Sequence, residues 1–276
     1  MASRLRSGLN WQQAASRLVS PIFDAIREPL RQVATAIDLP DPARLNQCAT
    51  GIKNFRGIPI RFVAADGLPA ALHYETRIAE TGEIATRANW HDFFNAMAWL
   101  AFHDTKSAIS ETHARVLADA GAPELLRRST ARDVLTLFDE GGMMVACDDD
   151  ALLDLIRNFQ WKALFVDRRA EVVKHMRFYL FGHSMLEKAL APYVGVTAKA
   201  LLFKVDADFL SATPAAQVTV IDGLAARWLM NEANLGAAEN FSPLPWLGIP
   251  GWWQANASPS FYDNQQYFRP GRKVGR

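Results

Sequence analysis

The sequence predicts an α+β protein that is rich in helices, with a small and mostly antiparallel sheet in one integrated domain. Half of its 276 residues are hydrophobic and 21% are charged, which is typical of a globular chain long enough to bury a large core. Helical periodicity recurs along the chain, whereas stretches that alternate as strands are few and short. The residues from Ser242 onward lack periodicity but are too aromatic for a solvated linker, so we expect an ordered C-terminal wrap.

The domain organisation follows from the N-terminal pattern. Residues 9–37 have an apolar helical face that is interrupted near Pro21 and Pro29. Beyond this segment the sequence contains no internal repeat, no low-complexity tract and no clear linker. We therefore expect residues 1–45 to form a peripheral helical segment and residues 46–276 to form a single integrated α+β domain.

The strand signals are short runs with β-branched residues and period-two alternation. Residues 72–78 and 83–87 look like the two arms of a hairpin, with the turn at Glu80-Thr81-Gly82. This hairpin is the main reason for expecting an antiparallel sheet. Further short strands are expected at residues 58–64, 142–147 and 200–205.

A helix that begins after Asn89 combines polar and apolar residues in an unusual way. Asn89 is a good N-cap, and residues 90–102 are apolar on nearly every side, which predicts a buried helix. The first turns nevertheless carry His91, Asp92 and Asn95, and a buried polar group without a partner costs about 1–3 kcal/mol. These residues are candidates for a site. The alternatives are that Asp92 interacts with the helix dipole and that His91 and Asn95 are satisfied inside the core.

The next two predicted helices carry further candidates. Lys106 lies in the first helix, where His113 shares an apolar face and is more simply a core histidine. Asp139 and Glu140 end the second helix, where carboxylates oppose the helix dipole by about 0.3–1 kcal/mol. Stability of the helix therefore does not explain them. An ion pair of Arg132 with Asp139 is the structural explanation, and a metal or substrate contact is the functional one.

Residues 171–190 form the longest helix candidate in the chain. His183 and Glu187 lie one turn apart in its apolar stripe, where they can orient an imidazole for acid–base chemistry or bind one metal ion. A partly buried ion pair is the structural alternative. The same stretch also matches a strand, a sharp turn and a helix with Ser184 as a nucleophile, but Leu186 replaces the second glycine of that motif. The long helix requires no special turn and is preferred.

The last part of the chain reads as one helix followed by the aromatic wrap. Residues 217–231 have the pattern of an amphipathic helix. In the wrap, Trp246, Trp252 and Trp253 are expected either to pack on the body of the protein, to cover a pocket, or to form a surface for a partner. Burial of these tryptophans would favour packing on the body, and exposure would favour a partner surface.

Composition excludes several classes of protein. The net charge of +1 argues against a dedicated nucleic-acid binder. The longest strongly apolar run, residues 93–102, is half of the roughly 20 residues that cross a bilayer, and the N-terminus lacks the apolar core of a secretion signal. Cys48 and Cys147 have neither metal nor redox spacing. We expect a soluble, cytoplasmic protein that does not insert into membranes. The sequence also lacks the G-x-G-x-x-G loop that binds dinucleotides and the Walker A loop that binds nucleoside triphosphates. The H-E-x-x-H motif of zinc metalloproteases is absent as well.

Five motifs together resemble the bacterial DUF3025 family, whose function is uncharacterised. They are W-H-D-x-F-N (90–95), R-D-x-L-T-L-F-D-E-x-G (132–142), G-H-x-x-x-E-K (182–188), L-G-I-P-G-W (247–252) and Y-F-R-P (267–270). The resemblance covers nearly the whole chain from the first strand onward and implies one integrated domain. It brings no cofactor, substrate or catalytic residue. The family tends to read F-P-x-T-K where this chain has His103 in place of the proline, which makes His103 a weaker site candidate.

Two functional hypotheses follow. The first is a hydrolytic enzyme acting on a small molecule, either metal-free or assisted by a divalent metal ion, and it requires three polar segments to meet in space. The second is a binding or assembly protein whose polar residues form a structural network. The first hypothesis assigns catalysis to His91, Asp92, His183 and Glu187, substrate binding to Asn95, Lys106 and Arg132, and metal binding to Asp139 and Glu140.

Overall fold

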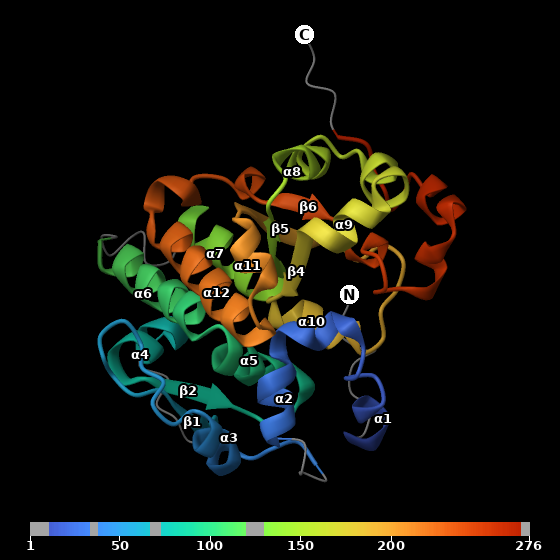
Figure 1. Cartoon of the computed structure of the whole chain (residues 1–276). Coiled ribbons are helices and arrows are strands. Elements are labelled where there is room, and N and C mark those ends of the chain that lie inside the picture. The colour runs from blue at the N-terminus through green and yellow to red at the C-terminus, as the bar shows by residue number, and fades with distance from the viewer. Residues whose placement is uncertain (1–10, 34–37, 67–72, 120–129, 272–276) are drawn as a thin grey trace.

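The computed structural model describes residues 11–33, 38–66, 73–119 and 130–271, in which helices surround two small sheets (Figure 1). The predicted α+β class is confirmed. The helices are α1 (Trp11–Ala15), α2 (Arg27–Val33), α3 (Pro42–Cys48), α4 (Tyr74–Thr81), α5 (Trp90–Ala101), α6 (His103–Asp119), α7 (Thr130–Gly141), α8 (Asp150–Arg157), α9 (Arg169–His175), α10 (His183–Ala189), α11 (Ala207–Ser211) and α12 (Pro214–Met230). The strands are β1 (Arg61–Ala64), β2 (Glu83–Thr86), β3 (Gly142–Cys147), β4 (Met176–Leu180), β5 (Ala198–Lys204) and β6 (Ser242–Leu244). Short 3₁₀ segments cover Pro21–Ile26, Glu232–Leu235, Ala238–Asn240, Trp246–Gly248, Gln254–Ala257 and Pro259–Asp263, and a π-helical turn covers Ala163–Asp167.

The larger sheet has four strands in the order β4-β3-β5-β6 and is of mixed orientation. β3 pairs antiparallel with β4 and parallel with β5, and β5 pairs antiparallel with β6. Every residue of β3 is buried, because the strand lies between two neighbours and contacts α7, α8 and α12. A strand that is covered on both faces is expected to read as a continuous apolar run, as Met143 to Cys147 do. β3 directly follows α7, and β4 leads into α10. The sheet therefore positions the C-terminus of α7 and the N-terminus of α10, where the candidate site lies.

The predicted hairpin at residues 72–78 and 83–87 is wrong. Residue 72 lies outside the described residues, His73 is an N-cap, and residues 74–78 belong to helix α4. Gly82 has φ 71° and ends this helix in the left-handed conformation, so the supposed turn signal is a helix C-cap. β2 then pairs with β1 in parallel, with Arg61 opposite Glu83. The parallel pairing follows because α4 forms the crossover that a hairpin lacks.

The predicted long helix over residues 171–190 is also wrong. It divides into α9, the strand β4 and α10. Tyr179 and Phe178 lie opposite Met144 and Val145 of β3, so pairing with a buried strand outweighs the helical pattern of the sequence. Locally, the chain follows the strand, turn and helix order that the sequence analysis ranked second. His183 and Glu187 still lie one turn apart, because both belong to α10.

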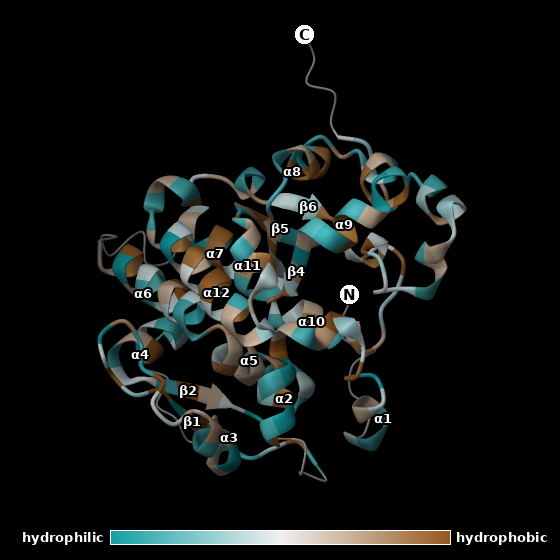
Figure 2. Cartoon of the chain, in the orientation of Figure 1, coloured by the Kyte–Doolittle hydropathy of each residue, from teal (hydrophilic) through white to brown (hydrophobic). Residues whose placement is uncertain are grey.

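The N-terminal segment shares the core of the protein. Phe23 stacks on Phe94 of α5 with ring centroids 5.8 Å apart, and Trp11 stacks on Trp90 at 5.9 Å. Figure 2 shows hydrophilic residues on the outward turns of α2 and α3 and hydrophobic stretches on α7 and α12. The division into residues 1–45 and 46–276 stays a prediction. Within the described ranges, no helix is both long enough and apolar enough to span a membrane.

The C-terminal aromatic segment is ordered and packs on the body of the protein, as predicted. Trp246 and Trp252 are buried, and their rings lie 6.1 Å apart. Tyr267 fixes the segment with two hydrogen bonds, because its hydroxyl donates to the Val196 carbonyl and accepts from the Leu247 amide. Trp253 is partly exposed. Most aromatic side chains of this segment are therefore buried within the molecule.

Candidate functional site

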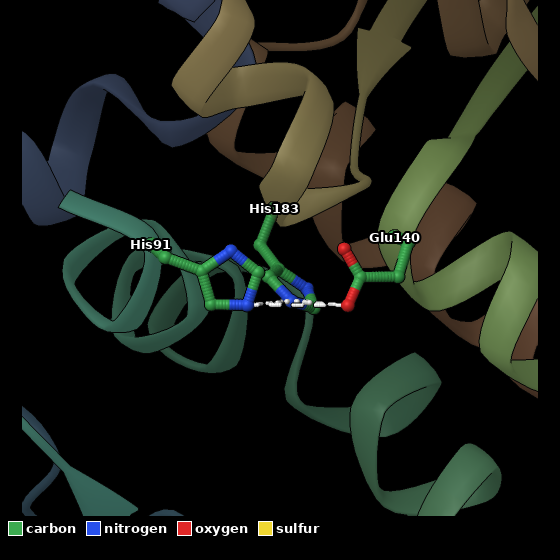
Figure 3. A group of neighbouring side chains, drawn as sticks. All are labelled: His91, Glu140 and His183. Atoms are coloured by element: carbon green, nitrogen blue, oxygen red, sulfur yellow. Dashed lines mark hydrogen bonds and ion pairs between the residues drawn. The ribbon is translucent and has the colours of Figure 1, made fainter. Parts of the chain in front are cut away.

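His91 and His183 meet although 91 residues separate them in the chain. α5 begins at Trp90, where the Asn89 side chain accepts a hydrogen bond from the Asp92 amide, so His91 lies in its first turn. His183 is the first residue of α10. Their Nε2 atoms lie 3.1 Å apart (Figure 3). The two imidazoles therefore face one another across the junction of the two helices.

Glu140 completes the group from the last turn of α7. Its Oε1 lies 3.3 Å from His183 Nε2 and 3.9 Å from His91 Nε2 (Figure 3). Two ligands at about 2.1 Å from a tetrahedral metal ion lie about 3.4 Å apart. The three separations therefore bracket the spacing that a tetrahedral ion requires. We call His91, His183 and Glu140 the two-histidine site.

Each imidazole of the two-histidine site has a carboxylate behind it. His91 Nδ1 lies 3.4 Å from Glu187 Oε2, and His183 Nδ1 lies 3.5 Å from Asp139 Oδ2. At 3.5 Å, His183 Nδ1 makes no hydrogen bond with any described residue, and His183 Nε2 instead contacts His91 and Glu140. Carboxylates that orient metal-binding histidines take the same place behind the ring. Both Nε2 atoms point toward the centre of the site. This carboxylate–histidine arrangement is typical of metal sites.

The two-histidine site is open on one side. The side chain of His183 is 5% exposed, whereas those of His91 and Glu140 are 40% and 42% exposed. Glu140 also borders a surface hollow of about 640 Å³. A small molecule therefore has access to the centre from the side of His91 and Glu140. The other residues that line the hollow are Thr130, Asp133, Val134, Thr136, Leu137 and Ala238.

The electrostatics favour an anionic Glu140 beside the imidazoles. Burial opposes ionisation of Glu140, but the hydrogen bond with His183 and the charges of both histidines outweigh it and lower the pKa of Glu140 to about 2. A hydrogen bond with Glu187 raises the pKa of His91, although burial works in the opposite direction. Ser184, in the first turn of α10, also hydrogen-bonds with Glu140 and lowers its pKa.

A glycine contact brings the elements of the site together. The Gly182 amide donates to the Gly142 carbonyl over 2.8 Å, which joins the β4–α10 turn to the α7–β3 junction. A Cβ atom on Gly182 would lie 2.5 Å from the Gly142 nitrogen and 2.6 Å from the Glu140 carbonyl oxygen. Only glycine permits this approach without a shift of the backbone. The approach sets His183 beside Glu140.

Lys106 has an internal partner. Its Nζ lies 2.5 Å from Asp139 Oδ1, and both side chains are buried. The ammonium also lies 5.7 Å from the centre of the Trp99 ring. The anionic group that the sequence analysis expected Lys106 to meet is, in this structure, Asp139. A role for Lys106 in binding substrate stays a prediction.

Asp92, Asn95 and Arg132 also contact protein groups. Asp92 accepts a hydrogen bond from the Arg87 amide over 2.8 Å, which fixes the entry to α5. Asn95 donates to the Tyr74 hydroxyl over 2.9 Å, while its own carbonyl oxygen is buried and has no hydrogen-bond partner among the residues that the structure describes. Arg132 Nη2 lies 3.2 Å from His73 Nε2. The predicted catalytic role of Asp92 and the predicted binding roles of Asn95 and Arg132 stay predictions.

Sequence reasoning missed a polar group on α4. The Ser110 hydroxyl donates to Glu75 Oε2 over 2.7 Å. Burial and the charge of Asp139 raise the pKa of Glu75 to about 7, although Lys106 and Ser110 act against this rise. The sequence analysis interpreted residues 72–78 as a strand and named none of them as a site candidate. The available signal was the spacing of Lys106 and Ser110, which lie one helical turn apart.

Two other features lie away from the two-histidine site. His103, Asp104 and Asp222 form a second group with ligand-type side chains, which we call the Asp222 cap. A groove of about 1170 Å³ is lined by residues of α2, β4, α12 and the C-terminal wrap, including Arg27, Arg177 and Trp252. The groove and the cap share His103 but none of the residues of the two-histidine site.

The comparison with protein families agrees with the resemblance seen in the sequence. No curated protein and no solved structure gives a significant match. The chain matches the sequence model of the family described as Protein of unknown function (DUF3025) over residues 60–272, a range that includes all three residues of the two-histidine site. Since this match covers most of the chain, the protein belongs to the DUF3025 family.

Proposed function

We propose that the protein is a hydrolytic enzyme assisted by a divalent metal ion, with His91, His183 and Glu140 as the metal ligands. The observation that carries the proposal is the convergence of two imidazole nitrogens and one carboxylate oxygen within 3.9 Å. In this proposal Asp139 moves from the predicted metal ligands to a supporting position, because its carboxylate faces His183 Nδ1. Glu187 has the same position behind His91.

The set of donors supports a catalytic site more than a structural one. Structural zinc sites usually have four protein ligands, whereas catalytic sites have three and keep one position for water or substrate. The two-histidine site offers two histidines and one glutamate, and His91 and Glu140 are the more exposed of the three. A divalent ion held by these residues would lower the pKa of a coordinated water to about 7 and would so supply hydroxide for hydrolysis.

The protein residues would then perform three tasks. His91, His183 and Glu140 hold the ion, and Glu187 and Asp139 orient the imidazoles from behind the rings. The hollow beside Glu140 receives the substrate. Because the hollow is small and partly apolar, the proposal is confined to small substrates with an ester, amide or phosphoester bond. The predicted binding roles of Asn95 on α5 and Arg132 on α7 are kept in this proposal.

Hydrolysis is tested on protein that has been stripped with a chelator and then dialysed to remove it. Its rates with p-nitrophenyl acetate and p-nitrophenyl phosphate are measured before and after addition of Zn²⁺ or Mn²⁺. We expect one ion to raise one of these rates at least about tenfold, as a Lewis acid and source of hydroxide should. Glu140→Gln should lose this increase, and His103→Ala should retain it. Equal rates for wild type with and without metal ions would contradict the proposal.

The alternative function as a binding or assembly protein has less support. That hypothesis uses the C-terminal aromatics as a partner surface, but Trp246 and Trp252 are buried against the body of the chain. The same hypothesis treats the polar residues as a structural network. It therefore predicts that the His91→Ala, His183→Ala double variant has a much lower melting temperature than wild type. A catalytic site predicts a small loss or a gain, because functional sites are seldom optimised for stability.

A further inference from the structure

We propose that the groove along β4 and α12 binds a carboxylate with a linear apolar chain, such as a medium-chain fatty acid, and that Arg177 holds the carboxylate. The groove shares no residue with the two-histidine site, so this proposal does not depend on the proposed function. Its evidence is the size of the groove, the apolar wall, and one arginine that has no carboxylate partner.

The groove has room for a small ligand and an apolar wall to receive it. Its volume is about 1170 Å³, whereas pockets for small molecules typically measure about 300–1,000 Å³. Phe178 of β4 and Trp252 of the C-terminal wrap both line it, with ring centroids 6.3 Å apart. Val172, Met176 and Ile249 continue this wall. An alkyl chain on the wall would leave water, and each methylene that does so can strengthen binding up to about fourfold.

Three arginines among the described residues line the groove, and two of them are in ion pairs. Arg27 lies 2.5 Å from a carboxylate oxygen of Asp24, and Arg31 lies 3.3 Å from one of Glu28. All four residues line the groove, so their charges cancel within its wall. The third arginine, Arg177, is therefore the one that can attract an anion.

Arg177 has no carboxylate partner among the residues that the structure describes. Its Nη1 instead donates over 2.8–3.2 Å to the carbonyl oxygens of Val173, Lys174 and Met176. These contacts fix the guanidinium at the end of α9. Carbonyl oxygens have no net charge, so the positive charge stays uncompensated. A guanidinium has five N–H donors, and those of Nε and Nη2 remain for a ligand.

The floor of the groove lies beside this guanidinium. Arg177 and Tyr179 are two residues apart on β4 and thus share one face of the strand. Burial raises the pKa of Tyr179, and the charge of Arg177 opposes the rise. The Tyr179 hydroxyl donates to Gln217, which in turn donates to the Leu210 and Ala212 carbonyls. These polar groups already have partners inside the protein, so the guanidinium is the group that a carboxylate would bind.

A carboxylate fits this site better than a phosphate. One guanidinium compensates one negative charge and can donate two parallel hydrogen bonds to a carboxylate. A phosphate monoester carries a charge of about −1.5 to −2 at neutral pH, so a site with one unpaired cation would leave part of that charge uncompensated.

The test is calorimetric titration of the full chain with decanoate, octanoate and decyltrimethylammonium, the last of which has a ten-carbon chain and the opposite charge. We expect decanoate to bind, octanoate to bind about 4- to 16-fold more weakly, and the cation to bind at least about tenfold more weakly. Arg177→Met should weaken decanoate binding at least about tenfold, as expected for loss of a charged hydrogen bond. Lys174→Met is the control, because it removes the same charge from an exposed residue that does not line the groove.

Val173→Glu is a second variant that keeps the Arg177 contacts with α9. Val173 lines the groove but is 62% exposed, so a glutamate is tolerated there and places a negative charge beside Arg177. It should weaken binding of decanoate and strengthen binding of decyltrimethylammonium. Val220→Glu is its control, because Val220 is 48% exposed and does not line the groove. Four results would overturn the proposal: no binding of decanoate, equal binding of decanoate and the cation, or wild-type decanoate affinity in folded Arg177→Met or in Val173→Glu.

Discussion

The two-histidine site and the Asp222 cap contain the same kinds of side chain but use them differently. In the Asp222 cap, Asp222 Oδ1 accepts from the Thr105 amide over 2.7 Å, and Oδ2 accepts from the Asp104 amide over 3.0 Å. The carboxylate thus satisfies the first backbone donors of α6. In the two-histidine site, the Glu140 carboxylate instead faces His91 and His183.

The difference shows that backbone contacts, and not residue types, separate a structural group from a candidate metal site. Asp222 is 1% exposed and bonded to amides through both oxygens, so ligation of a metal ion would release two buried donors. Nε2 of His91 and Nε2 of His183 instead contact each other and the Glu140 side chain, contacts that a metal ion between the three groups would replace. The Asp222 cap also contains a single imidazole, that of His103. The two-histidine site contains two imidazoles, whose Nε2 atoms lie 3.1 Å apart. The following predictions test this contrast.

The largest effect is expected for Gly182→Ala, which should break the two-histidine site and leave the Asp222 cap intact. The new Cβ would lie 2.5 Å from a backbone nitrogen and 2.6 Å from the Glu140 carbonyl oxygen, so the β4–α10 turn must shift. Such crowding costs about 1–3 kcal/mol of unfolding free energy. We expect this loss in urea denaturation, together with loss of Zn²⁺ binding in calorimetry.

Gly236→Ala is the control for this prediction. A Cβ atom on Gly236 meets nothing within 4 Å, and its φ of −70° suits any residue. This variant should be as stable as wild type or slightly more stable. Equal stability of the Gly182→Ala and Gly236→Ala variants would show that the glycine contact does not organise the site.

A second prediction compares Asp222→Ala with Glu140→Ala, which remove the same charge from the two groups. Asp222→Ala leaves two amides at the start of α6 without acceptors, so we expect a loss of about 2–4 kcal/mol in urea denaturation. Glu140→Ala should cost less than about 1 kcal/mol, because its side chain is 42% exposed and its interactions are screened. For Zn²⁺ binding we expect the opposite order, with a large loss in Glu140→Ala and little change in Asp222→Ala. A larger loss of stability in Glu140→Ala than in Asp222→Ala would reverse the assignment of the two groups.

The smallest effect concerns pH and the Asp222 cap. A hydrogen bond with Asp222 raises the pKa of His103 above its usual value of 6.5. The folded state therefore binds this proton more tightly than the unfolded state does. Its stabilising effect is complete below pH 6.5 and is lost as pH rises through the folded pKa. Because the His103 side chain is 41% exposed, His103→Ala should lose only a few tenths of a kcal/mol.

The measurement is urea denaturation of wild type and His103→Ala at pH 5.5 and pH 9. The difference between the two proteins should be larger at pH 5.5. A difference that grows toward pH 9 would show that His103 is not stabilised in its charged form by Asp222.

The fold class and most helices could be predicted from the sequence, because local patterns determine them. The N-cap at Asn89 and the apolar character of residues 90–102 place α5 within one residue of its actual end at Ala101. The hairpin failed because Gly82 serves equally well in a turn and at a helix C-terminus. β4 was hidden for a different reason. Its pairing partner β3 lies about 30 residues earlier, and no periodicity within residues 171–190 records that contact.

For the candidate site, the sequence identified the residues but not their relations. His91, His183 and Glu187 were singled out because they stood in apolar helical stretches, and Glu140 because a carboxylate at a helix C-terminus opposes the helix dipole. Their arrangement depends on the contact of Gly182 with Gly142, a tertiary feature that no local pattern contains. For the same reason, the sequence analysis considered Arg132 as the partner of Asp139, whereas Lys106 binds it in the structure.

The central claim is that the two-histidine site binds a metal ion, and elemental analysis tests it most directly. The protein is prepared without a histidine tag, dialysed against dilute zinc chloride, passed through a desalting column and examined by mass spectrometry of its metals. We predict about one zinc ion per wild-type chain, as expected for a site with three ligands, and far less in His183→Ala. His103→Ala should retain the ion. Wild-type protein without zinc, or His183→Ala with the full amount, would contradict the claim.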